Sequence, residues 1–244
     1  MYGDFAFIYD SLMTDVDYEN WYSYIKLILD KYNKNPKSIL EMACGTGNIS
    51  YYFAKDGYDL TCFDLSSDML SIAYNKLNQF KNVTLLNQNM IDFKINKEFD
   101  LIICLCDSIN YIIEKEHLLK TFRNVREHLS QNGIFVFDIN SYYKLEEIIG
   151  NNTFIEDRED IFYIWQNYFD CKDNISHFYL TFFVKEQNGL FRRFHEDHLE
   201  KAYKLEEVIE LLDMAGFSQI YSYDGFSFKA PNKRSERIHF VCLP

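Results

Sequence analysis

Ile39-Leu40-Glu41-Met42-Ala43-Cys44-Gly45-Thr46-Gly47 is the stretch of this sequence that decides the fold. An apolar run ends here in a turn with two glycines, and a helix-like segment follows at once. The next apolar run, 58–63, ends on Asp64. Glycine lets the backbone lie close to a ligand, and an acid after the second strand suits ribose hydroxyls. The pattern therefore predicts a nucleotide-type cofactor site at the carboxyl edge of a parallel sheet.

The charge around this turn distinguishes between cofactors. No Lys or Arg occurs between Ser38 and Ala54, and Glu41 comes just before the glycines. A dinucleotide fingerprint would carry a third glycine where Ser50 stands, and Glu41 would repel its pyrophosphate. S-adenosylmethionine carries an ammonium and a sulfonium group, which suit an acidic pocket without basic residues. The loop favours S-adenosylmethionine, and a nicotinamide-dependent oxidoreductase is the alternative from another class.

Two motifs resemble those of a known enzyme family. Residues 41–47 are similar to the first motif of class I S-adenosylmethionine-dependent methyltransferases, and Asp64-Leu65-Ser66-Ser67-Asp68-Met69-Leu70 is similar to their second motif. The opening segment 2–13, with Phe5-Ala6-Phe7-Ile8-Tyr9-Asp10, resembles a small-molecule and uncharacterised bacterial branch of this family. The resemblance implies methyl transfer from S-adenosylmethionine, and it says little about the acceptor.

Length and composition set the class of protein. At 244 residues and 48% hydrophobic residues, one α/β domain with an insertion can bury a sizeable core. No apolar stretch approaches the roughly 20 residues that span a bilayer, and no basic segment opens the chain as in a signal peptide. The six cysteines lie mostly in apolar runs, as in reduced cytoplasmic proteins, and none has zinc-finger spacing. We expect a cytoplasmic protein, a monomer or homodimer, with no metal site.

The net charge of −12 disfavours nucleic acid as a partner. The best basic clusters are Arg192-Arg193 and the segment 229–237, and both are interpreted as solvated surface because acidic or aromatic residues dilute them. A local patch stays possible at any net charge. A methyltransferase that acts on RNA or protein is therefore kept as an alternative to one that acts on a small molecule.

The order of elements predicts the architecture. Helices are expected at 18–32, 48–56, 66–78, 114–129 and 205–215, and strands at 38–42, 58–63, 83–86, 99–106, 134–139, 217–223 and 237–243. Alternation of strands and helices predicts an α/β fold with a Rossmann-like, doubly wound, mostly parallel seven-stranded sheet. The aromatic segment 154–199 has period-two stretches and predicts a small inserted antiparallel β-sheet. We expect a cofactor-binding domain at 1–140 and 201–244 with an N-terminal helical lid, and an inserted β cap at 141–200.

The carboxyl ends of the predicted strands collect the candidate cofactor contacts. Asp64 can accept hydrogen bonds from both ribose hydroxyls, and its alternative role is to cap the following helix. Leu65, Met69 and Met90 are candidates for packing against adenine, or for ordinary core filling. Tyr2 and Phe5 would close the site as an aromatic lid, or dock as part of a simple helix. The full set of candidates is Tyr9, Glu41, Ala43, Gly45, Gly47, Asp64, Leu65, Met69, Asn89, Met90, Cys106 and Ser108.

The segment after the fourth strand bears on the acceptor. Enzymes that methylate exocyclic amines of nucleic-acid bases commonly have an Asn/Asp-Pro-Pro-aromatic element there, and this chain has Cys106-Asp107-Ser108-Ile109. Cys106 is expected to contact the cofactor through its backbone, because a buried apolar thiol carries little thiolate. We expect a small-molecule acceptor that is methylated on nitrogen or oxygen.

A general base is needed only if the acceptor is a hydroxyl or an ammonium. The candidate bases are His195, Glu196 and His198, and Tyr9 and Asn140 are further catalytic candidates. Trp165 and Arg193 are candidate acceptor contacts. The alternative for segment 192–198 is an exposed edge strand with salt bridges. An aromatic wall favours a cationic amine, whereas Arg193 favours a carboxylate or phosphate, so the acceptor's charge stays open.

Overall fold

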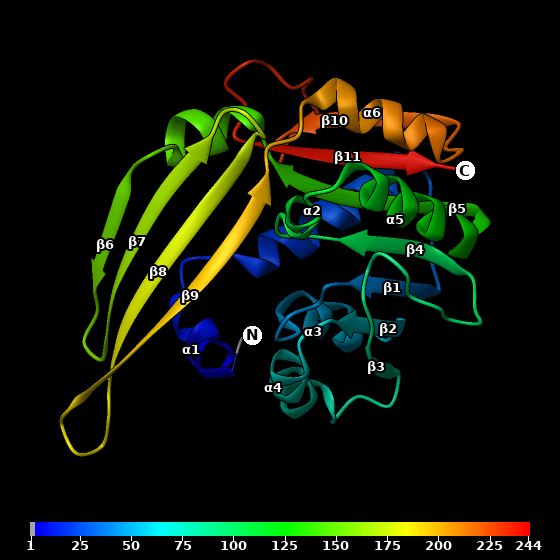
Figure 1. Ribbon diagram of the computed structural model, residues 1–244. Coiled ribbons are helices and arrows are strands. Elements are labelled where there is room, and N and C mark those ends of the chain that lie inside the picture. The colour runs from blue at the N-terminus through cyan, green and yellow to red at the C-terminus, as the bar shows by residue number, and fades with distance from the viewer. Residues whose placement is uncertain (1–2) are drawn as a thin grey trace.

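A seven-stranded sheet organises the protein in this computed structural model, which describes residues 3–244 (Figure 1). Tyr2, expected in the aromatic lid, lies outside the described residues. The strand order is β10-β11-β5-β4-β1-β2-β3, and the five strands from β5 to β3 run parallel. Strands β11 and β10 complete the sheet in antiparallel orientation. The Rossmann-like, mostly parallel sheet is thereby confirmed. Its strands are β1 (Ser38–Met42), β2 (Asp59–Asp64), β3 (Val83–Asn87), β4 (Phe99–Cys104), β5 (Leu129–Asn140), β10 (Gln219–Asp224) and β11 (Arg237–Leu243).

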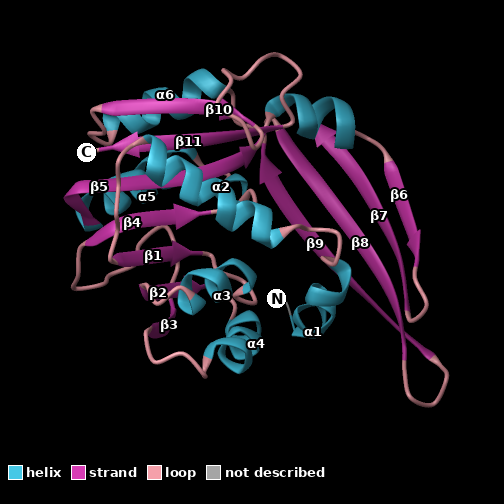
Figure 2. Ribbon diagram, turned by 180° about the vertical axis from the view of Figure 1, so that it is seen from behind, coloured by secondary structure: helices cyan, strands magenta, loops and turns pink. Residues whose placement is uncertain are grey.

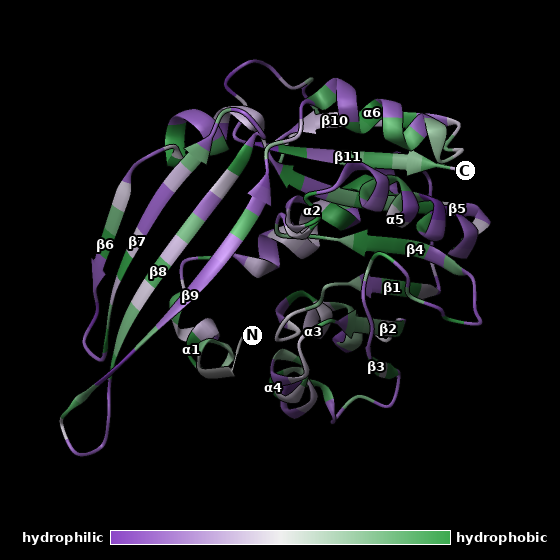
Figure 3. Cartoon of the chain, viewed as in Figure 1, coloured by the Kyte–Doolittle hydropathy of each residue, from purple (hydrophilic) through white to green (hydrophobic). Residues whose placement is uncertain are grey.

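Helices cover both faces of this sheet. The side chains of α2, α3 and α4 pack on one face, and those of α5 and α6 pack on the other. Alternate residues of β5 separate the two cores, since Ile134 and Val136 face the first and Phe135 and Phe137 face the second. Burial on both faces explains the apolar runs 101–104 of β4 and 134–137 of β5. The hydrophobic colouring of β4 stands out in Figure 3. The helices are α2 (Tyr18–Lys31), α3 (Asn48–Lys55), α4 (Ser67–Leu77), α5 (Lys115–His128) and α6 (Leu205–Met214).

Local chemistry fixes where elements begin and end. Ser66 caps α4 by accepting a hydrogen bond from the backbone N–H of Met69, at the start of the helix expected over 66–78. The expected strand 99–106 is too long, since β4 ends at Cys104. Cys106 and Asp107 have φ angles of 57° and 56°, in the left-handed region, which is incompatible with a continuing strand. In contrast, β5 begins at Leu129, five residues before the expected start.

A four-stranded antiparallel sheet is inserted between β5 and α6, as predicted from the aromatic segment. The inserted sheet is angled away from the seven-stranded sheet, and helix α1 (Gly3–Leu12) lies between these two sheets (Figures 1 and 2). Phe5, Ile8 and Leu12 of α1 pack against Phe182 of the insert and Met69 of α4. The inserted strands are β6 (Thr153–Asp157), β7 (Ile161–Asp170), β8 (Ile175–Lys185) and β9 (Phe191–Lys201). Of two short helical segments, η1 (Ser108–Tyr111) follows β4 and η2 (Lys144–Ile149) follows β5.

Replacement of Gly47 by Ala tests how tightly the turn packs at the start of α3. Gly47 has a φ of +77°, and an added Cβ would lie 2.9 Å from Leu77 Cδ1 and 3.3 Å from Ala73 Cβ. Gly189, at the β8–β9 hairpin, has a φ of +81° with nothing within 4 Å of an added Cβ. Both Ala variants should lose roughly 1–2 kcal/mol because of the left-handed backbone. Gly47→Ala should lose about 1 kcal/mol more in urea unfolding. Equal losses would contradict close packing between α3 and α4.

Candidate functional site

A cavity of about 820 Å³ lies between the carboxyl edge of the central sheet, helix α1 and the insert. This volume is within the range of roughly 300–1,000 Å³ that is usual for small-molecule sites. Except for Gly47, every candidate cofactor contact named from the sequence lines it. Gly47 instead provides the left-handed residue that precedes α3. The sequence motifs thus meet at one place, as the carboxyl ends of parallel strands must.

Asp64 ties the end of β2 to the glycine loop that follows β1. Its Oδ2 accepts a hydrogen bond from the Gly45 amide at 2.8 Å, and its Oδ1 accepts one from the Ser66 amide at 2.8 Å. Burial raises the pKa of Asp64, and these backbone N–H groups partly offset the effect. Each carboxylate oxygen retains a second lone pair for a further donor. Ser66 caps α4, so Asp64 is left as an acceptor facing the cavity.

Glu41 lies beneath the loop with a 3% exposed side chain. Its Oε2 accepts a hydrogen bond from the Ser50 hydroxyl at 2.6 Å, which explains a serine where a dinucleotide site would have glycine. Burial raises the pKa of Glu41 to about 7. The acid is therefore only partly ionised at neutral pH, and the electrostatic argument for it is weaker than the sequence suggests.

Left-handed backbone conformations gather at the ends of β1 and β4. Ala43 has a φ of 52°, and Cys106 and Asp107 follow the same pattern. Such conformations are costly for residues other than glycine and cluster at ligand sites. Ser108 donates from its hydroxyl to the carbonyl oxygen of Leu105 at 2.8 Å, which closes the turn. Burial raises the pKa of the Cys106 thiol, which agrees with a backbone role and not a nucleophilic one.

Helix α1 is fastened over the cavity by Asp10. Its Oδ1 accepts hydrogen bonds from Thr46 Oγ1 at 2.6 Å and Asn48 Nδ2 at 2.9 Å. Its Oδ2 pairs with Lys76 Nζ of α4 at 3.0 Å. Tyr9, the neighbouring residue, lines the cavity, and burial raises the pKa of its hydroxyl. The N-terminal segment is therefore joined directly to the glycine loop.

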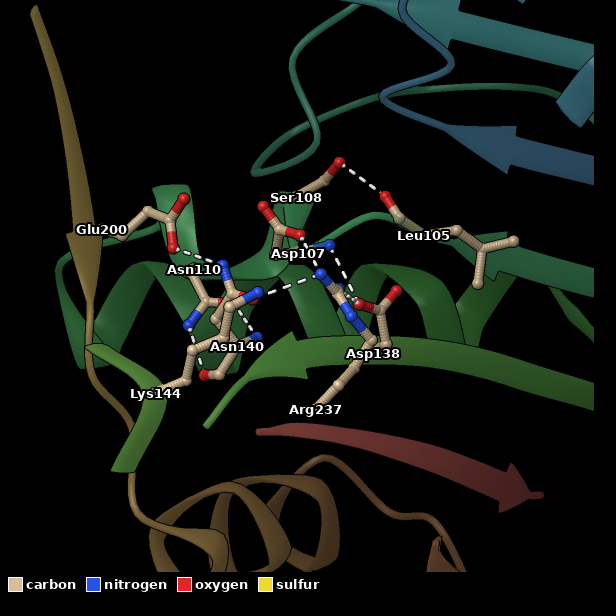
Figure 4. Close-up of polar contacts among 9 residues, drawn as sticks. All are labelled: Leu105, Asp107, Ser108, Asn110, Asp138, Asn140, Lys144, Glu200 and Arg237. Carbon is tan, nitrogen blue, oxygen red and sulfur yellow. Dashed lines mark hydrogen bonds and ion pairs between the residues drawn. The ribbon is translucent and has the colours of Figure 1, made fainter. Parts of the chain in front are cut away.

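A polar cluster forms the cavity wall opposite the glycine loop (Figure 4). Arg237 of β11 donates to Asp107 Oδ1 at 2.8 Å, to Asp138 and to Asn140 Oδ1 at 3.2 Å. Burial alone would lower the pKa of Arg237, but the carboxylates of Asp138 and Asp107 raise it overall. The interpretation of segment 229–237 as solvated surface is wrong for Arg237. Its partners lie just after β4 (Asp107) and on β5 (Asp138 and Asn140), so no local pattern reveals them.

Asn140 connects this cluster to Lys144 of η2 and Glu200 of β9 (Figure 4). Its Nδ2 donates to Glu200 Oε2 at 2.9 Å, and its Oδ1 accepts from Lys144 Nζ at 2.9 Å. Burial, reinforced by the Asp107 carboxylate, raises the pKa of Glu200 to about 8. Sequence reasoning missed Glu200 and Lys144. The available signal was the strand period, because Glu200 shares a face with Glu196 and His198.

The structure separates the other acceptor candidates. Trp165 and Asn140 line the cavity, whereas His195 and Arg193 are exposed and are not among its lining residues. Alternation along β9 places His198 on the cavity side, where burial lowers its pKa. Arg193, which was expected to favour an acceptor with a carboxylate or phosphate, is thus absent from the described lining.

The lining fits S-adenosylmethionine. A Cβ added at Gly45 would meet nothing within 4 Å, so the loop leaves open space there. Leu65 is 68% exposed, which leaves an apolar side chain beside Asp64. Glu41 and Asp64 supply acceptors, and no Lys or Arg of the described loop opposes a cationic ligand.

Known proteins with similar sequences and structures support the same chemistry. A family model described as "Methyltransferase domain" matches residues 39–133. A methyltransferase of Geobacillus sp. (strain WCH70) is 35% identical over 243 residues, which cover 98% of each chain. The crystal structure of an S-adenosylmethionine-dependent methyltransferase from Clostridium acetobutylicum has a TM-score of 0.89 at 38% identity, covering 98% of this chain and 97% of that one. The chain belongs to the class I S-adenosylmethionine-dependent methyltransferases.

Two further findings bear on this methyltransferase. None of the helices in residues 3–244 is long and apolar enough to cross a membrane. Among the same residues, no three His, Cys, Asp or Glu side chains are grouped so as to hold a metal ion.

Removal of the Asp64 carboxylate tests the cofactor side of the cavity. Asp64→Ala should weaken binding of S-adenosylhomocysteine by roughly 1.5–3 kcal/mol, the range for hydrogen bonds to charged groups. Titration calorimetry measures this effect. Asp68→Ala, in the first turn of the same α4 helix but outside the lining, is the matched control and should bind normally. Unchanged affinity in Asp64→Ala would place the ribose elsewhere.

Replacement of Asp10 tests whether α1 is held by its three side-chain contacts. Asp10→Ala should lower hydrogen-exchange protection of the α1 amides, because the link to Thr46, Asn48 and Lys76 is lost. Asp30→Ala, on α2 away from the cavity lining, serves as the control. If α1 protection is the same in both variants, packing of Phe5, Ile8 and Leu12 alone holds the helix.

Proposed function

We propose that this methyltransferase transfers the methyl group of S-adenosylmethionine to a small molecule bound in the cavity described above. The observation that carries the proposal is that one cavity holds both the motif residues and an aromatic and polar wall from the insert. Helix α1 and the insert cover it from the side opposite the sheet (Figure 2). Side chains that enclose a ligand in this way suit a compact acceptor better than a polymer.

Each half of the cavity has its own role in this proposal. On the side of β1 and β2, the loop 43–47 and Asp64 hold the cofactor, with Leu65, Met69 and Met90 against its base and Asn89 beside them. Backbone groups at Cys106 and Ser108 complete the contacts. When bound, the cofactor supplies an electrophilic methyl group on a sulfonium. The protein's part is to align the acceptor, which can contribute on the order of 7–11 kcal/mol.

The segment 141–200 is assigned as the cap that forms the acceptor side, and Tyr9 and Asn140 as acceptor contacts. Trp165, Phe178 and Glu200 reach the cavity from this segment. Although His195 is retained as a candidate from the sequence, its exposed position favours His198 for any histidine contact.

Relatives with named substrates support a small-molecule acceptor. The dTDP-3-amino-3,4,6-trideoxy-alpha-D-glucopyranose N,N-dimethyltransferase of Streptomyces venezuelae is 32% identical over 101 residues, 41% of each chain. The structure of DesVI from Streptomyces venezuelae, at 24% identity and a TM-score of 0.81, shares the fold over 98% of both chains. The N,N-dimethyltransferase is named for a single sugar nucleotide as its acceptor, which is consistent with a small molecule in the cavity.

A comparison of acceptor classes tests the proposal. S-adenosylhomocysteine formation should rise with pooled small metabolites and stay at background with bulk tRNA, rRNA and protein at equal cofactor concentration. Asp64→Ala should reduce the signal, which ties it to the cavity. Saturable label in a polymer, with none in small molecules, would reject a small-molecule acceptor and support the RNA or protein alternative.

A further inference from the structure

We infer that the methyl acceptor is a small amine that enters the cavity as a cation and pairs with Glu200. The inference rests on the proposed function and deepens it by naming the chemical class of the acceptor. Three features carry it, namely the position of Glu200, the charge balance of the lining and the aromatic groups that line the same cavity.

Glu200 comes near the end of β9, where the insert returns to the central sheet (Figure 1). Its side chain is 3% exposed and lines the cavity on the side away from Asp64 and the glycine loop. Oε2 accepts from Asn140 Nδ2 at 2.9 Å, and Oε1 points away from that contact (Figure 4). The hydrogen bond fixes the orientation of the carboxyl group and leaves one oxygen for a ligand.

The charge balance of the lining opposes an anion. Among described residues, seven carboxylates and three basic side chains line the cavity. Arg237 pairs with Asp107 and Asp138, and Arg158 pairs with Glu156 and Asp15. Lys144, the third base, donates to Asn140 next to Glu200. A carboxylate or phosphate would have to displace one of these contacts, whereas an ammonium finds an acid that is not matched by a guanidinium.

Aromatic side chains line the same cavity as Glu200. Phe178 comes from β8, which pairs with β9, and Trp165 comes from β7, one strand further. The ring centroids of Trp165 and Phe178 lie 5.5 Å apart, and those of Tyr111 and His198 lie 5.9 Å apart. All four line the cavity. Aromatic faces attract cations and remain compatible with an apolar carbon skeleton. An amine with an apolar body satisfies both the rings and the carboxylate.

The protonation state of Glu200 makes amine binding detectable as a release of protons. Burial and then the Asp107 carboxylate raise its pKa to about 8, against lowering contributions from Asn140, Lys144 and Arg237. Without a ligand, Glu200 is therefore mostly neutral at pH 7. A bound ammonium adds a positive charge that favours the ionised form, so binding should expel a proton.

The same acid can prepare the amine for methylation. The ammonium transfers one proton to the Glu200 carboxylate, which leaves a neutral amine with a lone pair. That pair forms the nitrogen–carbon bond to the methyl group while the carbon–sulfur bond breaks and its electron pair goes to sulfur. The product is a methylated ammonium, and Glu200 returns its proton to solvent. A base of this kind is needed because an ammonium has no lone pair.

Titration calorimetry with matched probes tests the inference. Cyclohexylamine, cyclohexanol and cyclohexanecarboxylate, together with the benzylamine, benzyl alcohol and benzoate set, are titrated into protein saturated with S-adenosylhomocysteine. We expect the amines to bind in preference to the matched carboxylates. Buffers of different ionisation enthalpy should report release of close to one proton per amine at about pH 7, and little release at about pH 9.5.

Glu200→Gln keeps the shape of the side chain and removes its charge. It should weaken amine binding by about tenfold or more and abolish the proton release. Glu196→Gln, on the same face of β9 but outside the lining, should behave as the unmodified protein. A folded-state pKa raised above the unfolded value means that ionisation of Glu200 costs stability as pH rises toward about 8. Glu200→Gln should therefore stay folded at neutral pH, and thermal unfolding checks this.

The outcomes separate the inference from the proposed function. Stronger binding of the carboxylates, no amine binding at millimolar concentration, or unchanged proton release in Glu200→Gln would each overturn the inference. If S-adenosylhomocysteine itself fails to bind the unmodified protein, the proposed function fails before any amine is added.

Discussion

The hydrogen bond from the Gly45 amide to Asp64 Oδ2 is the contact on which the site depends. It joins the turn after β1 to the end of β2. The same carboxylate also accepts a hydrogen bond from the amide of Ser66, the residue that caps α4. A buried carboxylate requires such donors, because an unpaired charge in this place would be costly. The loop in turn positions Thr46 and Asn48, which hold Asp10 of α1. The glycine loop and helix α1 thus share one set of contacts.

Acidic residues outnumber basic ones in the cavity lining, and they are held in two different ways. On the cofactor side, Glu41 and Asp64 are buried acceptors satisfied by hydroxyl and amide donors. In the polar cluster, Arg237 pairs with both Asp107 and Asp138, whereas Glu200 of the insert has the Asn140 amide as its partner and Lys144 nearby. Since a buried acid without a guanidinium tends to become neutral, Glu200 can change its charge when a cation arrives. The balance makes the cavity suited to a cationic cofactor and a basic acceptor.

Patterns that are local in the sequence predicted the fold and the place of the cavity well. Apolar runs gave β1 and β11 with their exact ends, and the glycine turn with Asp64 located the cavity. Local sequence patterns could not predict contacts between residues that are far apart in the sequence. Arg237 is separated from Asp107 by 130 residues, so its ion pair looked like surface charge. The predicted end of β4 was two residues too late. Cys106 and Asp107 have left-handed backbone conformations, and because neither is a glycine, nothing in the sequence indicated them. On β9, polar residues occupy both faces, so period alone did not say whether His195 or His198 points inward.

A crystal structure of the complex with S-adenosylhomocysteine measures the central claim most directly. The account predicts ribose oxygens within hydrogen-bond distance of Asp64, the adenosine beside Leu65 and Met69, and the sulfur facing the half of the cavity that Trp165 and Glu200 line. An adenosine bound in that insert-side half, with Asp64 contacting only Gly45 and Ser66, would contradict it.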